Sequence, residues 1–593
     1  MKLADYIASF LASQGVTHVF VFSGGASLHL IQGIANTTGM TFICPQHEQA
    51  GAMSADAYAR VTGNLGAAIA TSGPGATNLL TGVCCAYYDS VPVMFITGQV
   101  ATYRLKGNTG VRQFGFQETA VTDIFQSVTK YVTMIKDPRQ IRYELEKAAY
   151  LARSGRPGPV LIDVPDDVQR MEINPEDLPR FVPDPIVGAD SKIRYSVETC
   201  VRLLKEAERP VLIVGWGVRL SKAEKEAHRL FQRLGFPILP TWAVRDMLSA
   251  SHPLLVGAFG THGTRYGNFA VQNADFVLSV GARLDTKAAG TPLSSFARGA
   301  KKVIVDIDAS ELAKFEAFGM KPDLVIHADA REFLTLLNNA LTGIEAKDIS
   351  AWWGQIKKWQ ERYPICPQAY DEQESVNPYS FVKALSARLV ENQCIFVDTG
   401  CAVAWMLQAF DFKAGQRLFH DFNNTAMGYA LPGSIGACFG LGRRPVVCVT
   451  GDGSLQMNIQ ELATVIRHEL PIKIFLLNNH GHSMIQQTQD QWLESRYLAS
   501  SVEGGLAFPD FLQVAKAYGF PTINVTKNAD LARAIAEALS TDGPVFCNVE
   551  IGAAERVSPQ VVYGRPIEDM GPLLDRKEFS ENMLVAPVPE SLR

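Results

Sequence analysis

The sequence predicts an α/β protein built from three doubly wound parallel-sheet domains. Short apolar, β-branched runs alternate with longer stretches of helical periodicity, which is the pattern of parallel sheets. This alternation occurs in three segments, separated by two polar stretches that interrupt it. The 593 residues also provide enough chain for about three to four domains of ordinary size.

The predicted domains follow from the positions of these runs. Residues 1–165 contain HVFVF, GAAIAT, PVMFITG and PVLIDVP, and the proline-rich stretch EDLPRFVPDPIVGADS then predicts a linker. Residues 195–340 contain RPVLIVGWG, FVLSVGAR and KKVIVDIDA, and a linker rich in Trp and Lys follows. Residues 376–555 contain QCIFVDTG, RPVVCVTGDG and IKIFLLNN. Residues 556–593 lack clear periodicity and are predicted to form a closing tail.

Composition excludes several classes of partner. The net charge of −5, from 55 basic and 60 acidic residues without a basic stripe, argues against nucleic acid and membrane surfaces as partners. The ten cysteines are scattered without a CxxC pair, which indicates reduced thiols. The N-terminal segment has helical spacing interrupted by Asp5 and does not resemble a signal peptide. We therefore expect a cytoplasmic protein without a membrane span.

Two polar groups follow neighbouring strands of the third predicted domain. Asp452 comes directly after RPVVCVTG, a helix is predicted over residues 457–470, and Asn478-Asn479 end the next strand. Parallel strands joined by such a crossover bring their carboxyl ends to one edge of the sheet. Mg²⁺ prefers oxygen ligands and usually shares them with phosphates. The sequence predicts a magnesium–diphosphate clamp here; the alternative is a Gly-Asp-Gly turn and an Asn-Asn helix cap.

This pairing resembles the signature of thiamine-diphosphate enzymes, in which Gly-Asp-Gly precedes Asn-Asn by about twenty-five residues. The resemblance implies that Asp452, Asn479 and the carbonyl of Gly481 hold the metal. It also implies further contacts to thiamine diphosphate from residues around the clamp, namely Gly400, Gly451, Gly453, Ser454 and Met484.

The same resemblance gives a role to Glu48, which follows TFIC and opens a helix rich in Ala and Gly. It implies that Glu48 hydrogen-bonds the aminopyrimidine of the cofactor so that the thiazolium carbon loses its proton. The alternative is an ordinary acid at a helix N-terminus. In this family the cofactor lies between the N-terminal domain of one subunit and the third domain of another, so a homodimer or homotetramer is expected.

Longer motifs resemble acetolactate synthase and its relatives within this superfamily. They are PQHEQAGAMSADAYAR, ATSGPGATNLLTGV, FGFQET, SVTKYV and TAMGYALPGSIGA. By position, Gly25, Phe116 and Gln117 are expected to line the pocket above the thiazolium, and Met427 to bend the cofactor. The alternative for Met427 is a core methionine.

The middle segment resembles the FAD-holding loops of the same relatives in GWGVR, GTHGT, GARLD and VDIDA. Gly-rich turns after strands allow backbone amides to approach phosphates. FAD is therefore expected at Gly215, Gly217, Gly260, His262, Gly263, Arg283 and Asp306. A vestigial domain without a nucleotide remains an alternative, with ADP or CoA nucleotides as lesser ones.

The chain departs from the acetolactate synthase pattern at four places. Gly400-Cys401-Ala402-Val403 replace Gly-Gln-His-Gln, which implies that two diphosphate-binding side chains are missing. The other three concern the acceptor: Thr488 replaces a tryptophan, Thr261 a methionine and Lys287 an arginine. We expect an acceptor pocket that is larger and more polar than one built for a second 2-oxo acid.

The leading functional prediction is a carboligase that decarboxylates a 2-oxo acid, with pyruvate as the first candidate, and transfers its acyl unit to a small-molecule carbonyl acceptor such as a keto-sugar. The alternatives are a flavin-dependent pyruvate oxidase, a simple 2-oxo acid decarboxylase and a non-catalytic oligomer. The sequence leaves the donor, the acceptor and the need for a regulatory subunit open.

Overall fold

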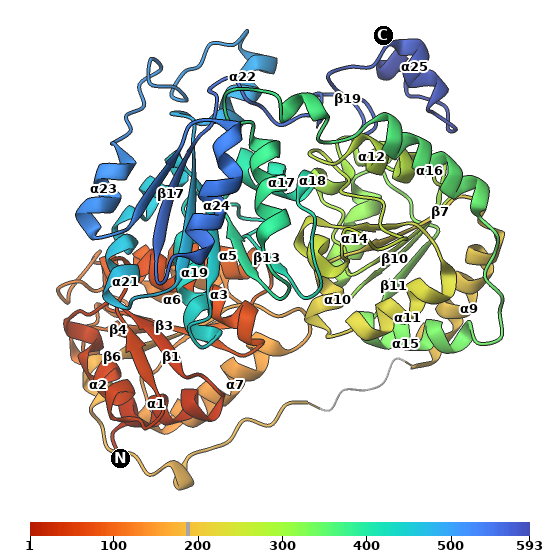
Figure 1. Ribbon diagram of the computed structural model, residues 1–593. Coiled ribbons are helices and arrows are strands. Elements are labelled where there is room, and N and C mark those ends of the chain that lie inside the picture. Colours follow the sequence, from red (N-terminus) through yellow and green to blue (C-terminus); the bar gives the residue numbers. More distant parts are fainter. Residues whose placement is uncertain (185–189, 593) are drawn as a thin grey trace.

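Three parallel β-sheets organise the chain, and helices connect their successive strands (Figure 1). The computed structural model describes residues 1–184 and 190–592. The sheets contain six, five and six strands, which confirms the predicted α/β class with three parallel-sheet units. Part of the linker predicted over residues 176–191, namely 185–189, lies outside the described residues.

The N-terminal sheet has the strand order β2-β1-β3-β4-β6-β5. The direction of the order reverses between β1 and β3, and ligands bind at such switch points in open α/β sheets. Its strands are β1 (His18–Val21), β2 (Thr41–Ile43), β3 (Gly66–Ala70), β4 (Val93–Gln99), β5 (Tyr131–Met134) and β6 (Val160–Pro165). Its helices are α1 (Leu3–Ser13), α2 (Leu28–Asn36), α3 (Glu48–Thr62), α4 (Pro74–Asn78), α5 (Leu80–Tyr88), α6 (Val121–Phe125), α7 (Ile141–Arg153) and α8 (Asp166–Gln169).

The central sheet has the order β11-β10-β9-β7-β8, with its switch point between β7 and β9. Its strands are β7 (Pro210–Val214), β8 (Ile238–Pro240), β9 (Phe276–Val280), β10 (Lys301–Asp306) and β11 (Leu324–His327). Its helices are α9 (Asp190–Glu206), α10 (Trp216–Leu220), α11 (Glu224–Leu234), α12 (Arg265–Gln272), α13 (Thr286–Ala289), α14 (Ala309–Ala317), α15 (Ala330–Ala340) and α16 (Ser350–Arg362).

The third sheet has the order β13-β12-β14-β15-β17-β16. Its strands are β12 (Cys394–Val397), β13 (Arg417–Phe419), β14 (Val446–Gly451), β15 (Ile472–Asn478), β16 (Thr522–Val525) and β17 (Val545–Glu550). Its helices are α17 (Pro378–Arg388), α18 (Cys401–Ala409), α19 (Ala430–Gly440), α20 (Asp452–Met457), α21 (Leu462–Arg467), α22 (Ser483–Trp492), α23 (Phe511–Tyr518) and α24 (Leu531–Ser540).

The helix predicted over residues 457–470 is interrupted. Helix α20 already begins at Asp452, and a short 3₁₀ turn separates it from α21. Asn458 causes the break: its backbone leaves the helical region at φ −138° and ψ 29°, and its amide donates to the carbonyl of Gly428 at 2.8 Å. A side chain that bonds to distant backbone in this way competes with helix formation. The break leaves a separate short helix whose N-terminus lies at Asp452.

Helices α3 and α19 pack together and join the N-terminal sheet to the third sheet. Close approach is possible because both helices are rich in small residues; a Cβ on Gly436 would lie 2.0 Å from the carbonyl oxygen of Ser54. The Ser54 hydroxyl donates to the Pro432 carbonyl at 2.8 Å. Buried residues of both helices belong to one hydrophobic core. Glu48, at the start of α3, is thereby fixed relative to the third sheet of its own chain.

The C-terminal tail packs on the central sheet, where Figure 1 shows α25 (Arg576–Glu581) at the chain's end. Two short antiparallel strands, β18 (Gln560–Val561) and β19 (Met570–Gly571), precede it. Ile567 and Phe579 join the core of the central sheet. Across residues 1–184 and 190–592, no helix has both the length and the hydropathy needed to cross a bilayer.

Candidate functional site

Asp452 and Asn479 meet at the carboxyl edge of the third sheet, as the strand pattern predicts. Strands β14 and β15 pair in parallel up to Gly451 and Leu477, so the next residues of each strand emerge together. The Asp452 carboxylate is 2% exposed and accepts hydrogen bonds from the amides of Gly453 (2.6 Å), Asn479 (3.1 Å) and Gly481 (3.2 Å). Burial raises the pKa of Asp452, and the surrounding amides oppose that shift.

Two further oxygen atoms lie beside this carboxylate. The side-chain oxygen of Asn479 lies 2.9 Å from the Gly481 carbonyl oxygen and 3.3 Å from Asp452 Oδ2, and no donor separates them. Exchanging the amide oxygen and nitrogen would turn both contacts into hydrogen bonds, so the amide orientation distinguishes a cation-bound site from a cation-free one. In the orientation shown, a carboxylate, an amide and a carbonyl oxygen face one point, which is the donor set that Mg²⁺ takes. Among the described residues no group of three His, Cys, Asp or Glu side chains offers a different metal site.

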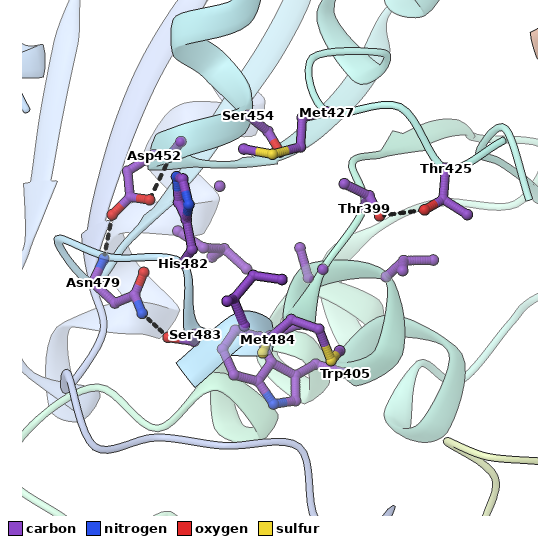
Figure 2. A pocket seen from close by; sticks show the side chains of 18 of the residues that line it. Thr399, Trp405, Thr425, Met427, Asp452, Ser454, Asn479, His482, Ser483 and Met484 are labelled. Atoms are coloured by element: carbon purple, nitrogen blue, oxygen red, sulfur yellow. Dashed lines mark hydrogen bonds between the residues drawn. The ribbon is translucent and has the colours of Figure 1, made fainter. Parts of the chain in front are cut away.

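All the predicted clamp residues of the third sheet line one cavity of about 320 Å³, which we call the first cavity (Figure 2). These residues are Gly400, Met427, Gly451, Asp452, Gly453, Ser454, Asn479, Gly481 and Met484. Gly400 adopts φ +81°, a conformation that favours glycine. Figure 2 shows Met427 and Ser454 on the wall that also carries Asp452. The structure therefore brings these residues together around a single space.

The N-terminal candidates do not line the first cavity of their own chain. Glu48 is 7% exposed; its Oε2 accepts from the Asn78 amide at 2.9 Å, while Oε1 accepts no hydrogen bond from any described residue. A Cβ on Gly75 would lie 3.1 Å from Oε1, so glycine keeps the space beside that oxygen open. Phe116 is 85% exposed, and nothing lies within 4 Å of a Cβ built on Gly25.

Gln117 adopts φ +65° and packs against Gly73, in the same exposed region as Phe116. None of the four N-terminal candidates lines the first cavity. Within one chain the two halves of the predicted site therefore remain apart.

Two further cavities follow the central sheet. The second, of about 100 Å³, shares Trp242 and Lys287 with the first cavity. The third, of about 290 Å³, contains the predicted residues Gly217, Arg283 and Asp306, and shares Arg283 with the second. The three cavities thus adjoin one another between the Asp306 strand end and the Asp452 clamp, and we call this row of cavities the path.

Gly215, Gly260 and Gly263 line none of these three cavities. Backbone packing explains why they are glycines. A Cβ on Gly215 would lie 2.2 Å from the Gly281 carbonyl oxygen, and one on Gly260 would lie 2.4 Å from the Lys287 carbonyl oxygen. The packing around these glycines therefore explains them without the phosphate contact that the motif resemblance implies.

His262 lines the first cavity and is 3% exposed, yet neither ring nitrogen has a hydrogen-bond partner. Burial, reinforced by the nearby Lys287 ammonium, lowers the pKa of His262 to about 3, so the ring is neutral at neutral pH. A neutral imidazole has one donor and one acceptor, and leaving a buried polar group unpaired costs about 1–3 kcal/mol. The orphaned ring therefore fits a polar ligand, which is what an FAD at this position would supply.

Several lining residues were missed by sequence reasoning. Trp242 lines the first cavity from the start of a 3₁₀ helix and His420 from the loop after β13. His482 lies against Gly453, where a Cβ would meet its Nε2 at 2.4 Å. His420 is 1% exposed and its Nδ1 lies 2.9 Å from the Val397 carbonyl, so Nδ1 donates and Nε2 remains an acceptor. Burial lowers the pKa of His420 to about 4. Of these residues, only His482 could have been predicted to line the cavity, because it follows Asn479 by three residues.

Two of the three acceptor departures lie elsewhere than expected. Thr488 does not line the first cavity; its hydroxyl donates to the Met484 carbonyl one turn earlier in α22, at 3.1 Å. Thr261 does not line it either, and its backbone pairs with Lys287 and with Val561 of the tail. The orientation of α22 places Thr488, and packing against the tail places Thr261. The motif comparison includes neither of these influences. Lys287 and Cys401 do line the cavity.

Comparisons with known proteins agree with this architecture. Residues 1–126, 197–337 and 398–549 match family models described as thiamine pyrophosphate enzyme, N-terminal TPP binding domain, central domain and C-terminal TPP binding domain. The chain therefore belongs to the thiamine pyrophosphate enzyme family.

Within this family the chain is an acetolactate synthase-like, thiamine-diphosphate-dependent enzyme. It is 35% identical over 582 residues to acetolactate synthase 2, chloroplastic, of Nicotiana tabacum, covering 96% of this chain and 85% of that one. It is 33% identical over 578 residues to the acetolactate synthase large subunit of Cyanidium caldarium, covering 95% of both.

Proposed function

We propose that this enzyme decarboxylates a 2-oxo acid, with pyruvate as the first candidate, and transfers the acyl unit to a carbonyl acceptor that carries hydroxyl groups, such as a keto-sugar. Its cofactors in this proposal are thiamine diphosphate, Mg²⁺ and FAD. The observation that carries the proposal is that Lys287 and His420 line the same cavity as the clamp.

Asp452, Asn479 and the Gly481 carbonyl would hold Mg²⁺ and, through it, the diphosphate. Bound thiamine diphosphate supplies the electron sink that permits loss of CO₂ and acyl transfer. Glu48 would hold a proton at the aminopyrimidine, since its Oε1 is free of protein donors while Asn78 fixes Oε2. Met427 would press against the cofactor from the cavity wall.

We infer that two subunits complete each site. The first cavity contains no residue of the N-terminal unit, whereas Phe116 is exposed and Gly25 has free space beside it, which leaves this face of the N-terminal unit accessible to a partner. A homodimer, or a tetramer of two dimers, would place this face of one protomer over the first cavity of its partner.

The chemistry of the cavity favours a hydroxylated acceptor. His420 presents an acceptor nitrogen and Lys287 presents a cation, whereas His262 is assigned to the flavin. A site built to hydrogen-bond hydroxyls rejects analogues that lack them far more strongly than an apolar pocket discriminates a methylene. A second pyruvate would pair with the Lys287 ammonium but leave the His420 imidazole unpaired.

The adjoining cavities of the path support the binding of FAD, and they also favour one alternative function. Because the second cavity meets the first at Trp242 and Lys287, a flavin lying along the path would approach the reacting groups. A flavin-dependent pyruvate oxidase is therefore the second candidate.

The test is a product analysis. Enzyme, thiamine diphosphate, Mg²⁺ and pyruvate are incubated with a panel of carbonyl acceptors, and products are identified by mass spectrometry. Acetylated products from hydroxylated ketones support the proposal; acetolactate as the sole product at a full synthase rate would refute the acceptor assignment.

A further inference from the structure

Asp89 of the N-terminal unit lies at the end of α5 and is 3% exposed. Its carboxylate is bonded on both oxygens. Oδ2 accepts from Arg60 Nη2 at 2.9 Å and from the Phe422 amide at 2.8 Å. Oδ1 accepts from the amide and the side chain of Asn423, at 3.1 and 2.5 Å. Three of these four bonds go to a segment more than three hundred residues away in the chain.

That segment, residues 420–427, connects β13 to α19 and contributes to all three cavities. His420, Thr425 and Met427 line the first cavity. Phe422 and Asn423 line the second, and Asn423 also lines the third. The position of this one connection therefore determines the walls of the thiamine site and of the path along the central sheet.

The connection is held in a conformation that needs support. Thr425 adopts φ +50°, which is unusual for a β-branched residue. Its hydroxyl meets that of Thr399 at 3.0 Å, as Figure 2 shows. The Asp421 carboxylate accepts from the Ala426 amide at 3.0 Å, near the C-terminal end of the connection. Asp89 bonds Phe422 and Asn423, near its N-terminal end.

Asp89 is also connected to the central unit by hydrogen bonds, once directly and once through Asn423. Its backbone carbonyl accepts from Trp216 Nε1 at 3.0 Å, and Trp216 lines the second and third cavities. Asn423 Oδ1 accepts from Arg283 Nη1 at 2.6 Å, and Arg283 lines the same two cavities. One residue of the N-terminal unit thus contacts both the thiamine-site segment and the wall of the dinucleotide path.

Charge balance does not explain these contacts. Arg60 already pairs with Asp56 at 2.7 Å inside the same buried network, so its charge has a partner without Asp89. A buried carboxylate is retained at low cost only when its oxygens are fully hydrogen-bonded. The bonds that satisfy Asp89 are mainly those to Phe422 and Asn423.

We propose that Asp89 is a positioning residue that holds residues 420–427 in the shape required by the thiamine site and the dinucleotide path together. The two ligands are named from the proposed function, on which this inference rests for their identity. The conformational part of the inference does not depend on it.

The test uses the full-length Asp89→Asn variant, in which an amide nitrogen replaces one acceptor and faces donors. Hydrogen–deuterium exchange of a peptide covering residues 420–427 is expected to become at least tenfold faster. The dissociation constants of thiamine diphosphate with Mg²⁺ and of FAD are both expected to rise by about tenfold.

The matched control is Asp56→Asn. Asp56 is similarly buried and bonds the same Arg60; its contact nearest to the segment is the Tyr429 hydroxyl, which lies outside residues 420–427. It is expected to lower the thermal midpoint without selectively accelerating exchange in that segment. Equal exchange in the two variants, or unchanged exchange in Asp89→Asn, would overturn the inference.

Asn423→Ala provides a second variant if Asp89→Asn does not fold. It removes the Arg283 contact and the side-chain bond to Asp89, but keeps the backbone amides of Phe422 and Asn423 from which Asp89 accepts. FAD affinity is expected to fall about tenfold with thiamine diphosphate affinity nearly unchanged, and no change in either would count against the inference. If wild-type protein binds neither cofactor, the proposed function fails, and the exchange comparison still decides the role of Asp89.

Discussion

The Asp452 carboxylate accepts the backbone amides of both Asn479 and Gly481, at 3.1 and 3.2 Å. This contact joins the ends of β14 and β15 and leaves the Asn479 side-chain oxygen and the Gly481 carbonyl facing the same point. A turn and a helix cap would not require the Asn479 and Gly481 oxygens to converge beside this carboxylate. The contact therefore underlies the first prediction.

Asp452→Ala is expected to weaken Mg²⁺-dependent binding of thiamine diphosphate by at least about 100-fold, because the buried charge that bridges metal and protein is lost. Asn479→Ala removes a neutral ligand and should weaken binding less. Isothermal titration calorimetry with and without Mg²⁺ measures both. Unchanged affinity in Asp452→Ala would mean that the stretch is only a turn and a cap.

Glu48→Gln is expected to keep thiamine diphosphate binding while turnover falls by about 10²–10⁴-fold, the usual contribution of a positioned acid–base group. The amide retains the shape and the Asn78 contact but cannot exchange the proton. Steady-state rates and cofactor affinity are measured on the same preparation. Near-wild-type turnover would remove Glu48 from the proposed mechanism.

FAD in the central path predicts a yellow purified protein. His262→Leu should weaken flavin binding by about ten- to 100-fold, since a buried ring would no longer meet the ligand's polar atoms, with thiamine diphosphate affinity retained. Absorbance and flavin release report the outcome. A colourless wild-type protein indifferent to added FAD would contradict the assignment, and rapid bleaching by pyruvate alone would favour the oxidase.

Glu461 predicts a pH dependence of stability. It is fully buried, accepts from the Gln46 amide at 2.8 Å and the Thr464 hydroxyl at 2.7 Å, and burial raises its pKa from 4.5 to about 7. Between pH 4.5 and about pH 7 the folded state therefore binds more protons than the unfolded state. The free energy of unfolding decreases as the pH rises through this range. Glu461→Gln should stabilise the protein by about 1–3 kcal/mol at pH 8 and by little at pH 4.

Denaturant unfolding at the two pH values measures this difference. Glu503→Gln, on an exposed loop, serves as the control. Equal effects of Glu461→Gln at both pH values would show that the carboxyl group does not titrate differently on folding.

The parts of the site that could be predicted from sequence are those fixed by strand ends. Asp452 and Asn479 follow adjacent buried strands, so their meeting follows from parallel topology alone. His420 could not be found in this way, because it lies in a connection whose course depends on Asp89 far away in the chain. Thr488 was misplaced because the rotation of α22 is set by packing that no local pattern records.

The fold class was predictable for the same reason, since β-branched runs separated by helical periods describe three parallel sheets. The single helix predicted over 457–470 was wrong because Asn458 bonds to Gly428, a contact between elements. Gly215 and Gly260 matched nucleotide-loop motifs, but the close approach of neighbouring backbone accounts for them. Local patterns thus located the sheet edges, and long-range contacts decided which side chains line the cavities.

The acceptor is tested most directly by competition. Wild-type enzyme with thiamine diphosphate, Mg²⁺ and pyruvate is given a hydroxylated keto-sugar, and both products are quantified over time, with Lys287→Met and His420→Phe assayed in parallel. We expect acetyl transfer to the keto-sugar to exceed acetolactate formation in the wild type, and to fall by about tenfold or more in each variant. Acetolactate formed at a full synthase rate, with the keto-sugar untouched, would contradict the account.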